Sequence, residues 1–132
     1  MTLLRLLVLL VFAALPVRAE TPLSAAEFEA FTTGKTLWYE AGGITYGVEE
    51  YLPGRRVRWS FLDDECKDGT WYEEAGYICF AYENGLGPQC WQFFRDGDGL
   101  RARFRGDSAQ SDLYGARQLD REMICTGPRI GV

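Results

Sequence analysis

The sequence predicts a mainly β protein: a small antiparallel barrel or sandwich, built as a meander of seven to eight strands with one short N-terminal helix. From Thr36 onward, apolar and polar residues alternate with the period of two that is typical of half-buried strands. Turn residues recur about every ten positions, which is the spacing of short antiparallel strands. Four cysteines in 132 residues, with no histidine, favour an exported disulfide-bonded domain. At this length we expect a single domain.

The N-terminus has the composition of a cleaved secretory signal peptide. An apolar run at 6–15 follows a single arginine, and the small residues Val17 and Ala19 stand where a signal peptidase reads. The run is about half of the roughly 20 residues that a membrane span needs. We therefore expect residues 1–19 to be a signal peptide and residues 20–132 to form the domain, with a periplasmic or secreted location and no membrane span after cleavage.

The charge of the mature chain excludes one class of partner. Cleavage removes Arg5 and Arg18 and leaves 12 basic against 19 acidic side chains, a net charge of −7. Nucleic acids and anionic lipids are bound through clusters of Lys and Arg. We therefore expect no nucleic acid partner.

The helix is predicted near the start of the mature chain. Ser24 and Glu27 have the spacing of a capping box, and Gly34 stands where a helix of two to three turns would end. Phe28 and Phe31 would share one face with Ala25. That face is expected to plug one end of the sheet or to cover it.

The strands are predicted from alternation between turn residues. The segment after Arg56 is the clearest, since Val57, Trp59 and Phe61 alternate with Arg56, Arg58 and Ser60. A turn is expected at 67–69 and a bulge or bend at 75–76. The tail after 120 is expected to be irregular and held by a disulfide. The predicted strands are 36–40, 45–51, 56–62, 70–74, 77–82, 89–95, 100–106 and 113–119.

The cysteines predict two disulfides. A hairpin of 77–82 and 89–95 can place Cys79 opposite Cys90, which leaves Cys66 to pair with Cys125. Of the three possible pairings we favour this one. A zinc site is the alternative, but the chain has neither a C-x-x-C motif nor a histidine.

No catalytic residues and no metal or cofactor site are predicted. Without histidine, the usual triads and most hydrolytic zinc sites are excluded. Acidic doublets such as Glu49-Glu50 would place one carboxylate on each side of a strand, which does not suit a glycosidase. The segment Asp96–Gly99 lacks the later oxygen ligands of a calcium loop and reads as a turn.

Aromatic residues are the strongest candidates for a binding surface. The central stretch from Cys66 to Trp91 contains Trp71, Tyr77 and Trp91, and we expect their outward faces to be available for a sugar or a protein partner. The alternative is that the aromatic rings fill the interior of a small barrel.

The run GTWYEEAGYICFAYENGLGPQCW resembles a group of uncharacterised small exported proteobacterial proteins. Their pattern is glycine-x-tryptophan, then a cysteine, then cysteine-tryptophan, and the resemblance covers about residues 23–104. It implies a periplasmic location and a disulfide-bonded β fold. A weaker likeness, through Tyr77-Ile78-Cys79, is to periplasmic lysozyme inhibitors, whose serine-glycine loop this sequence lacks.

The sequence thus favours a non-enzymatic periplasmic or secreted protein with a binding or structural role and an unknown protein or glycan partner. The alternative is an inhibitor of a cationic lytic enzyme such as lysozyme, which the negative charge suggests.

Overall fold

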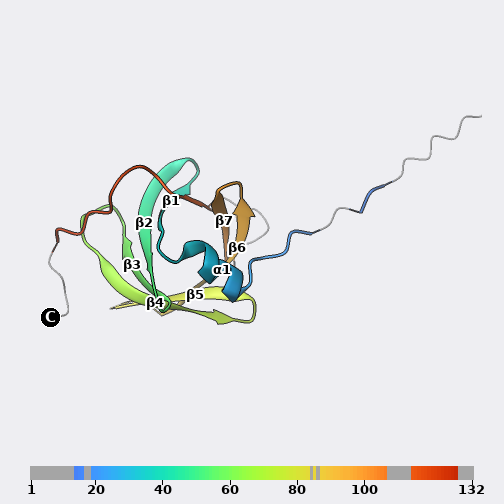
Figure 1. Cartoon of the computed structure of the whole chain (residues 1–132), viewed down its shortest axis with the longest axis horizontal. Coiled ribbons are helices and arrows are strands. Elements are labelled where there is room, and N and C mark those ends of the chain that lie inside the picture. The colour runs from blue at the N-terminus through green and yellow to red at the C-terminus, as the bar shows by residue number, and fades with distance from the viewer. Residues whose placement is uncertain (1–13, 17–18, 84, 86, 107–113, 128–132) are drawn as a thin grey trace, which may run out of the picture.

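The chain folds into a closed barrel of eight antiparallel strands with one short helix, as Figure 1 shows. The computed structural model describes residues 14–16, 19–83, 85, 87–106 and 114–127; most of the predicted signal peptide lies outside them. Each strand pairs with the next in sequence, and β8 pairs back with β1. The elements are α1 (Ala25–Thr32), β1 (Thr36–Ala41), β2 (Ile44–Leu52), β3 (Arg56–Ser60), β4 (Lys67–Glu74), β5 (Tyr77–Tyr82), β6 (Gln89–Asp96), β7 (Gly99–Phe104) and β8 (Tyr114–Arg117).

This architecture confirms the predicted mainly β meander with its N-terminal helix, and it decides for a barrel over a sandwich. Closure gives every strand two hydrogen-bonded neighbours, so no sheet edge is left open. Within the described part of the chain, no helix is long and apolar enough to cross a membrane.

The two ends of the barrel differ in their connections. At the end next to α1, called the closed end, the strands are joined by tight turns at 53–55, 75–76 and 97–98. At the opposite end, called the open end, one connection is a tight turn and three are longer, at 42–43, 61–66, 83–88 and 105–113. Short turns leave room for a helix to pack over the closed end.

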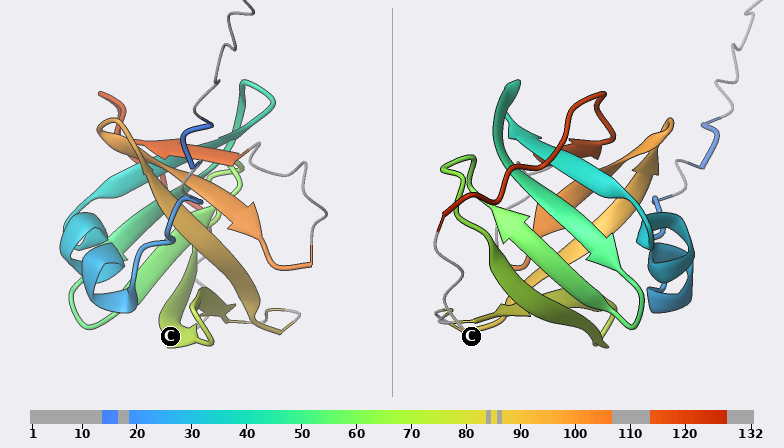
Figure 2. Two further views of the ribbon diagram at one scale, coloured as in Figure 1. Left: turned by 90° about the vertical axis from the view of Figure 1, so that its right-hand side faces the viewer. Right: turned by 60° about the vertical axis from the view of Figure 1, so that its left-hand side comes forward.

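Helix α1 plugs the closed end, as the two views in Figure 2 show. Ser24 is the N-cap, and its hydroxyl accepts a hydrogen bond from the Glu27 amide at 3.1 Å. Phe28 is fully buried, and its ring meets four rings of the barrel interior, namely Tyr51, Trp71, Phe80 and Phe93. The predicted plugging role of the helix is confirmed.

An arginine links the helix to the closed rim. The Arg55 guanidinium lies 3.1 Å from the Glu29 carboxylate and 4.5 Å from the centre of the Trp71 ring. The Gly34 amide donates to the Tyr51 carbonyl at 2.8 Å, which joins the end of the helix to β2. The helix is therefore fixed to the barrel at its middle and just beyond its C-terminal end.

The C-terminal segment 118–127, called the outer strap, crosses the outside of the barrel over β1, β2 and β3 (Figure 2, right). The Cys66–Cys125 disulfide ties it down. Beneath it, Trp38 and Ser60 are buried on the outer face, and the Arg121 guanidinium lies 4.1 Å from the Trp38 ring centre. The predicted irregular tail is confirmed within these residues, and it explains why Ser60 is buried while Arg56 on the same face is exposed.

The expected turn at 67–69 is wrong, because these residues begin β4. Asp68 pairs with Arg58 on β3, and their side chains form an ion pair at 3.0 Å. Asp68 and Gly69 are typical turn residues, but their pairing with β3 places them in a strand. A Cβ at Gly69 would lie 2.6 Å from the Ala81 carbonyl oxygen, so the glycine is there for close strand contact.

Candidate ligand cavity

A cavity of about 170 Å³ lies inside the barrel toward the open end. Its described lining is dominated by aromatic rings from six strands and the segment after β3. The only other lining residues in this part of the chain are Glu49 and Gln89. The aromatic lining residues are Tyr39, Tyr46, Trp59, Phe61, Phe80, Tyr82, Trp91, Phe93 and Tyr114.

The plug sets the floor of this cavity. Phe28 of α1 packs against Phe93 at 4.5 Å and against Phe80 at 6.3 Å between ring centres, and both of these rings also line the cavity. The helix therefore fills the closed half of the interior and leaves the other half hollow. Phe61 and Gln89, which are exposed, stand at the mouth.

A bulge in β2 shapes one wall. Tyr39 pairs with Gly47 whereas Glu40 pairs with Thr45, so Tyr46 is the extra residue of β2. A Cβ at Gly47 would lie 2.2 Å from the Trp59 ring. Glycine at this position therefore lets the indole lie flat against β2.

Glu49 is the one acidic residue in the described lining, and it is 1% exposed. Its Oε1 accepts a hydrogen bond from the Tyr82 hydroxyl at 2.8 Å. Its Oε2 is buried and has no hydrogen-bond partner among the residues that the structure describes. Burial raises the pKa of Glu49 from its ordinary 4.5 to about 8, although the bond from Tyr82 acts in the opposite direction.

The neighbouring tyrosines are neutral hydroxyls. The Tyr39 and Tyr51 hydroxyls share a hydrogen bond, and burial raises the pKa of each well above 10. Burial likewise raises the pKa of Tyr82, and that of Tyr46 to about 12. Glu49 is thus the group of this cavity whose charge changes near neutral pH.

The cavity holds a single carboxylate among its described lining residues. Glu50, the neighbour of Glu49, pairs with Arg58 and faces the outside of the barrel, as strand alternation requires. The arrangement can bind a small molecule through aromatic contacts and one polar anchor. It does not offer the two facing carboxylates that glycoside hydrolysis uses.

The three aromatic residues expected on one outward surface lie in three different places. Trp71 is buried at the closed end, 5.1 Å from Phe28 between ring centres. Tyr77 is on the outside of the barrel beneath the Arg105 guanidinium. Trp91 points inward and lines the cavity. This corrects the expectation of a shared face, because strand position places the two tryptophans inside the barrel.

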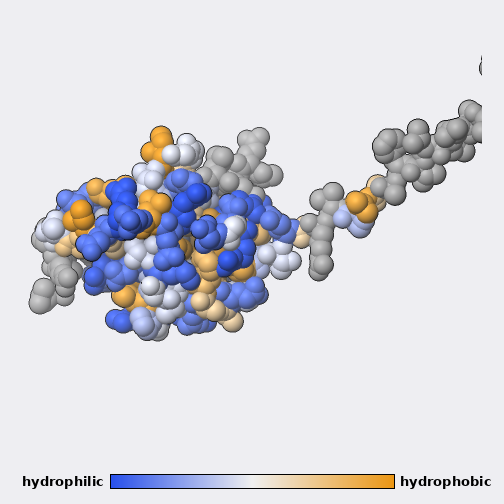
Figure 3. Space-filling model, turned by 45° about the horizontal axis from the view of Figure 1, so that its top comes forward, coloured by the Kyte–Doolittle hydropathy of each residue, from blue (hydrophilic) through white to orange (hydrophobic). Residues whose placement is uncertain are grey.

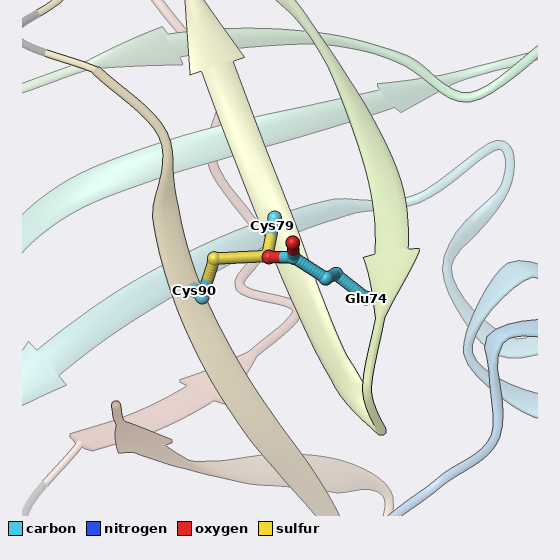
Figure 4. Close-up of side chains that lie close together, drawn as sticks. All are labelled: Glu74, Cys79 and Cys90. Carbon is cyan, nitrogen blue, oxygen red and sulfur yellow. A yellow bond between two sulfur atoms is a disulfide. The ribbon is translucent and has the colours of Figure 1, made fainter. Parts of the chain in front are cut away.

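The cysteines form the two predicted disulfides, Cys66–Cys125 and Cys79–Cys90. The second joins directly paired residues of β5 and β6, with 4.0 Å between their Cα atoms. Figure 4 shows the Glu74 carboxylate beside this bond. Because both sulfurs are covalently paired, they offer no thiolates to a metal ion.

Glu49 was not singled out by the sequence, although a signal for it exists. Gly47, Glu49 and Tyr51 alternate on β2, so Glu49 shares the face of a tyrosine that belongs in the core. An acidic residue on the apolar face of a strand is unusual and marks a candidate site. The signal was missed because Glu49 and Glu50 together resemble a solvated acidic doublet.

Together these features define a small eight-stranded barrel with an aromatic cavity open at one end. Comparisons with protein-family models, with curated proteins and with solved structures found no match. The site must therefore be interpreted from its own geometry.

Proposed function

We propose that the protein is an exported, non-enzymatic binding protein that holds one compact, largely apolar ligand inside the barrel. The observation that carries this proposal is the aromatic cavity with a buried, unpaired carboxylate oxygen in it. Ligand sites are typically concave and apolar, with a few polar groups that orient the ligand.

The dimensions suit a small molecule. Eight strands enclose an interior that can be filled by side chains or can hold one small ligand. Here Phe28 and the core side chains around it fill the interior at the closed end, and a cavity remains toward the open end. A dry cavity of about 150 Å³ is sufficient for benzene, so a volume of about 170 Å³ suits one ring with a short substituent.

The two disulfides support an extracellular or periplasmic location, where such bonds persist. On the one face that Figure 3 shows, hydrophilic residues predominate and hydrophobic residues are scattered, so this face offers no broad apolar docking surface.

Closing the mouth of the cavity tests the proposal. Gln89→Trp places a large ring at the mouth, and Gln92→Trp places the same ring on the outer face of the same strand. Binding of 2-phenylethanol, phenethylamine and phenylacetate is measured by isothermal titration calorimetry. We expect at least one probe to bind the wild type and Gln92→Trp but not Gln89→Trp. Binding that survives Gln89→Trp, or no binding of any probe, contradicts the proposal.

The alternative, inhibition of a cationic lytic enzyme, is supported by the excess of acidic side chains, with a net charge of −5 for the whole chain and −7 without residues 1–19. Electrostatic attraction of this kind is strongest at low ionic strength. Its test is the lytic rate of lysozyme with and without the purified protein at low salt. An unchanged rate removes this alternative.

A further inference from the structure

One buried oxygen in the cavity lacks a partner. Glu49 Oε1 accepts a hydrogen bond from the Tyr82 hydroxyl, whereas Oε2 has no partner within the described part of the chain. A buried polar atom left unsatisfied costs of the order of 1–3 kcal/mol. A ligand that donates a hydrogen bond to Oε2 removes this cost, so Glu49 is a ready anchor for a donor group.

The rings around Glu49 favour positive charge over negative charge. Trp59 lies 5.9 Å from Tyr46 and Trp91 lies 5.1 Å from Tyr114, measured between ring centres, so the walls consist of electron-rich rings. Aromatic faces attract cations. Among the described lining residues there is no Lys or Arg that would balance Glu49 or bind an anion.

Resting on the binding function proposed above, we infer that the ligand is a compact aryl-alkyl amine in its protonated form. Its ammonium group donates to Glu49 Oε2, and its ring packs among Trp59, Trp91 and Tyr114. A divalent metal ion is a poorer occupant, because Ca²⁺ takes six to eight oxygen ligands and the described lining supplies one carboxylate.

This ligand class couples binding to proton release. Below pH 8 the free protein holds Glu49 mostly as the neutral acid. The protonated amine binds the carboxylate, so the Glu49 proton leaves to solvent and one ammonium enters.

No described cationic group faces this pair. The titratable groups around it are Tyr39 from β1, Tyr46 and Tyr51 from β2, Tyr82 from β5 and Tyr114 from β8; β3 and β6 contribute Trp59, Gln89, Trp91 and Phe93.

The coupling predicts the direction and size of a pH effect. A cation that needs the ionised form of Glu49 gains affinity as pH rises toward 8, by about tenfold for each pH unit. Between pH 6 and pH 8 we expect the affinity for phenethylamine to rise about 50-fold, with about one proton released at pH 6. Calorimetry in buffers of different ionisation enthalpy measures that release.

Three matched probes and two matched variants separate the outcomes. At pH 7 phenethylamine should bind more tightly than 2-phenylethanol, and phenylacetate should bind weakest. Glu49→Gln should weaken amine binding and abolish its pH dependence, whereas Glu50→Gln, on the outer face, should change neither. Circular dichroism and the affinity for 2-phenylethanol verify that Glu49→Gln keeps the fold and the cavity.

Each contrary result has a distinct meaning. If 2-phenylethanol binds as tightly as the amine, and Gln89→Trp abolishes both, the inference is overturned while the binding function stands. If affinity falls as pH rises, Glu49 acts as a proton donor to a neutral acceptor, and the amine is likewise ruled out. If no probe binds at any pH, the binding function fails as well.

Discussion

Burying Glu49 costs folding free energy, whereas the proposed binding function needs a polar group at this position. Its side chain is 1% exposed, and a charge there is separated from water, so burial raises its pKa to about 8. A leucine or glutamine would avoid this cost. A barrel that needs only a packed interior has no use for such a group, whereas a binding site does, and this contrast is the main support for the proposed ligand site inside the barrel.

The raised pKa predicts how stability depends on pH. The folded state keeps the Glu49 proton up to about pH 8, whereas the unfolded chain releases it near 4.5. Between these values the folded state binds more protons, so the free energy of unfolding falls as pH rises, by at most about 1.4 kcal/mol per pH unit. We expect urea unfolding to show this decline from pH 5 to pH 8 in the wild type.

Glu49→Gln isolates the contribution of this one carboxyl group. The amide oxygen can still accept the hydrogen bond from Tyr82, but it does not titrate. The difference in unfolding free energy between variant and wild type should therefore grow in favour of the variant as pH rises toward 8. A difference that is constant with pH would show that Glu49 titrates alike in both states.

At the scale of elements, α1 decides how much of the interior is filled. Phe28 is fully buried and contacts Tyr51, Trp71 and Phe93. We expect Phe28→Ala to lower the free energy of unfolding by about 3–5 kcal/mol, the usual cost of removing a buried aromatic ring. The measurement is chemical denaturation followed by tryptophan fluorescence.

Phe31→Ala is the matched control on the same helix. Phe31 is half-buried at the margin of the core, and its ring is covered by the Lys35 ammonium and the Arg95 guanidinium. Its removal should cost clearly less than that of Phe28. Equal losses would mean that the helix stabilises the barrel mainly by covering its rim and not by filling its interior.

The elements were predictable because their signals are local. The alternation of Val57, Trp59 and Phe61 and the tight turn at 97–98 are visible in the sequence, and the strands lie within a few residues of their expected bounds. Barrel closure depends on the pairing of β8 with β1, which joins segments about 75 residues apart. Neighbouring pairs in a barrel and in a sandwich have the same local pattern, so this pairing left no signal.

The candidate site was less predictable than the fold, for the same physical reason. Which face of a strand points inward is known only when the barrel is closed. Trp71 and Trp91 were expected to have outward faces and lie inside, and Ser60, on the outer face of β3, lies under the outer strap. The disulfide pairing was an exception, since Cys79 and Cys90 lie on one hairpin and left Cys66 and Cys125 as the remaining pair.

At the scale of the whole molecule, β1–β3 serve two structures: their inner face lines the cavity, and their outer face is covered by the outer strap. The inner face of β1–β3 contributes Tyr39, Glu49 and Trp59 to the cavity, and the outer face carries Trp38 under the outer strap. The Cys66–Cys125 disulfide joins the outer strap to the segment 61–66, and its residues are 59 positions apart in sequence and do not line the cavity. Stability and binding should therefore respond separately to its removal.

The double variant Cys66→Ala/Cys125→Ala tests this separation. Loss of a cross-link that closes a loop of this length should lower the free energy of unfolding by about 4 kcal/mol in the chain-entropy model. The strap should also open and expose Trp38, so limited proteolysis should cleave after Arg121 faster than in the wild type. Affinity for the cavity probes should be unchanged wherever the variant is folded, because no described residue of the strap lines the cavity. Weakened probe binding at full folding would show that the strap also holds the cavity in shape, through the segment 61–66 that carries both Cys66 and the cavity residue Phe61.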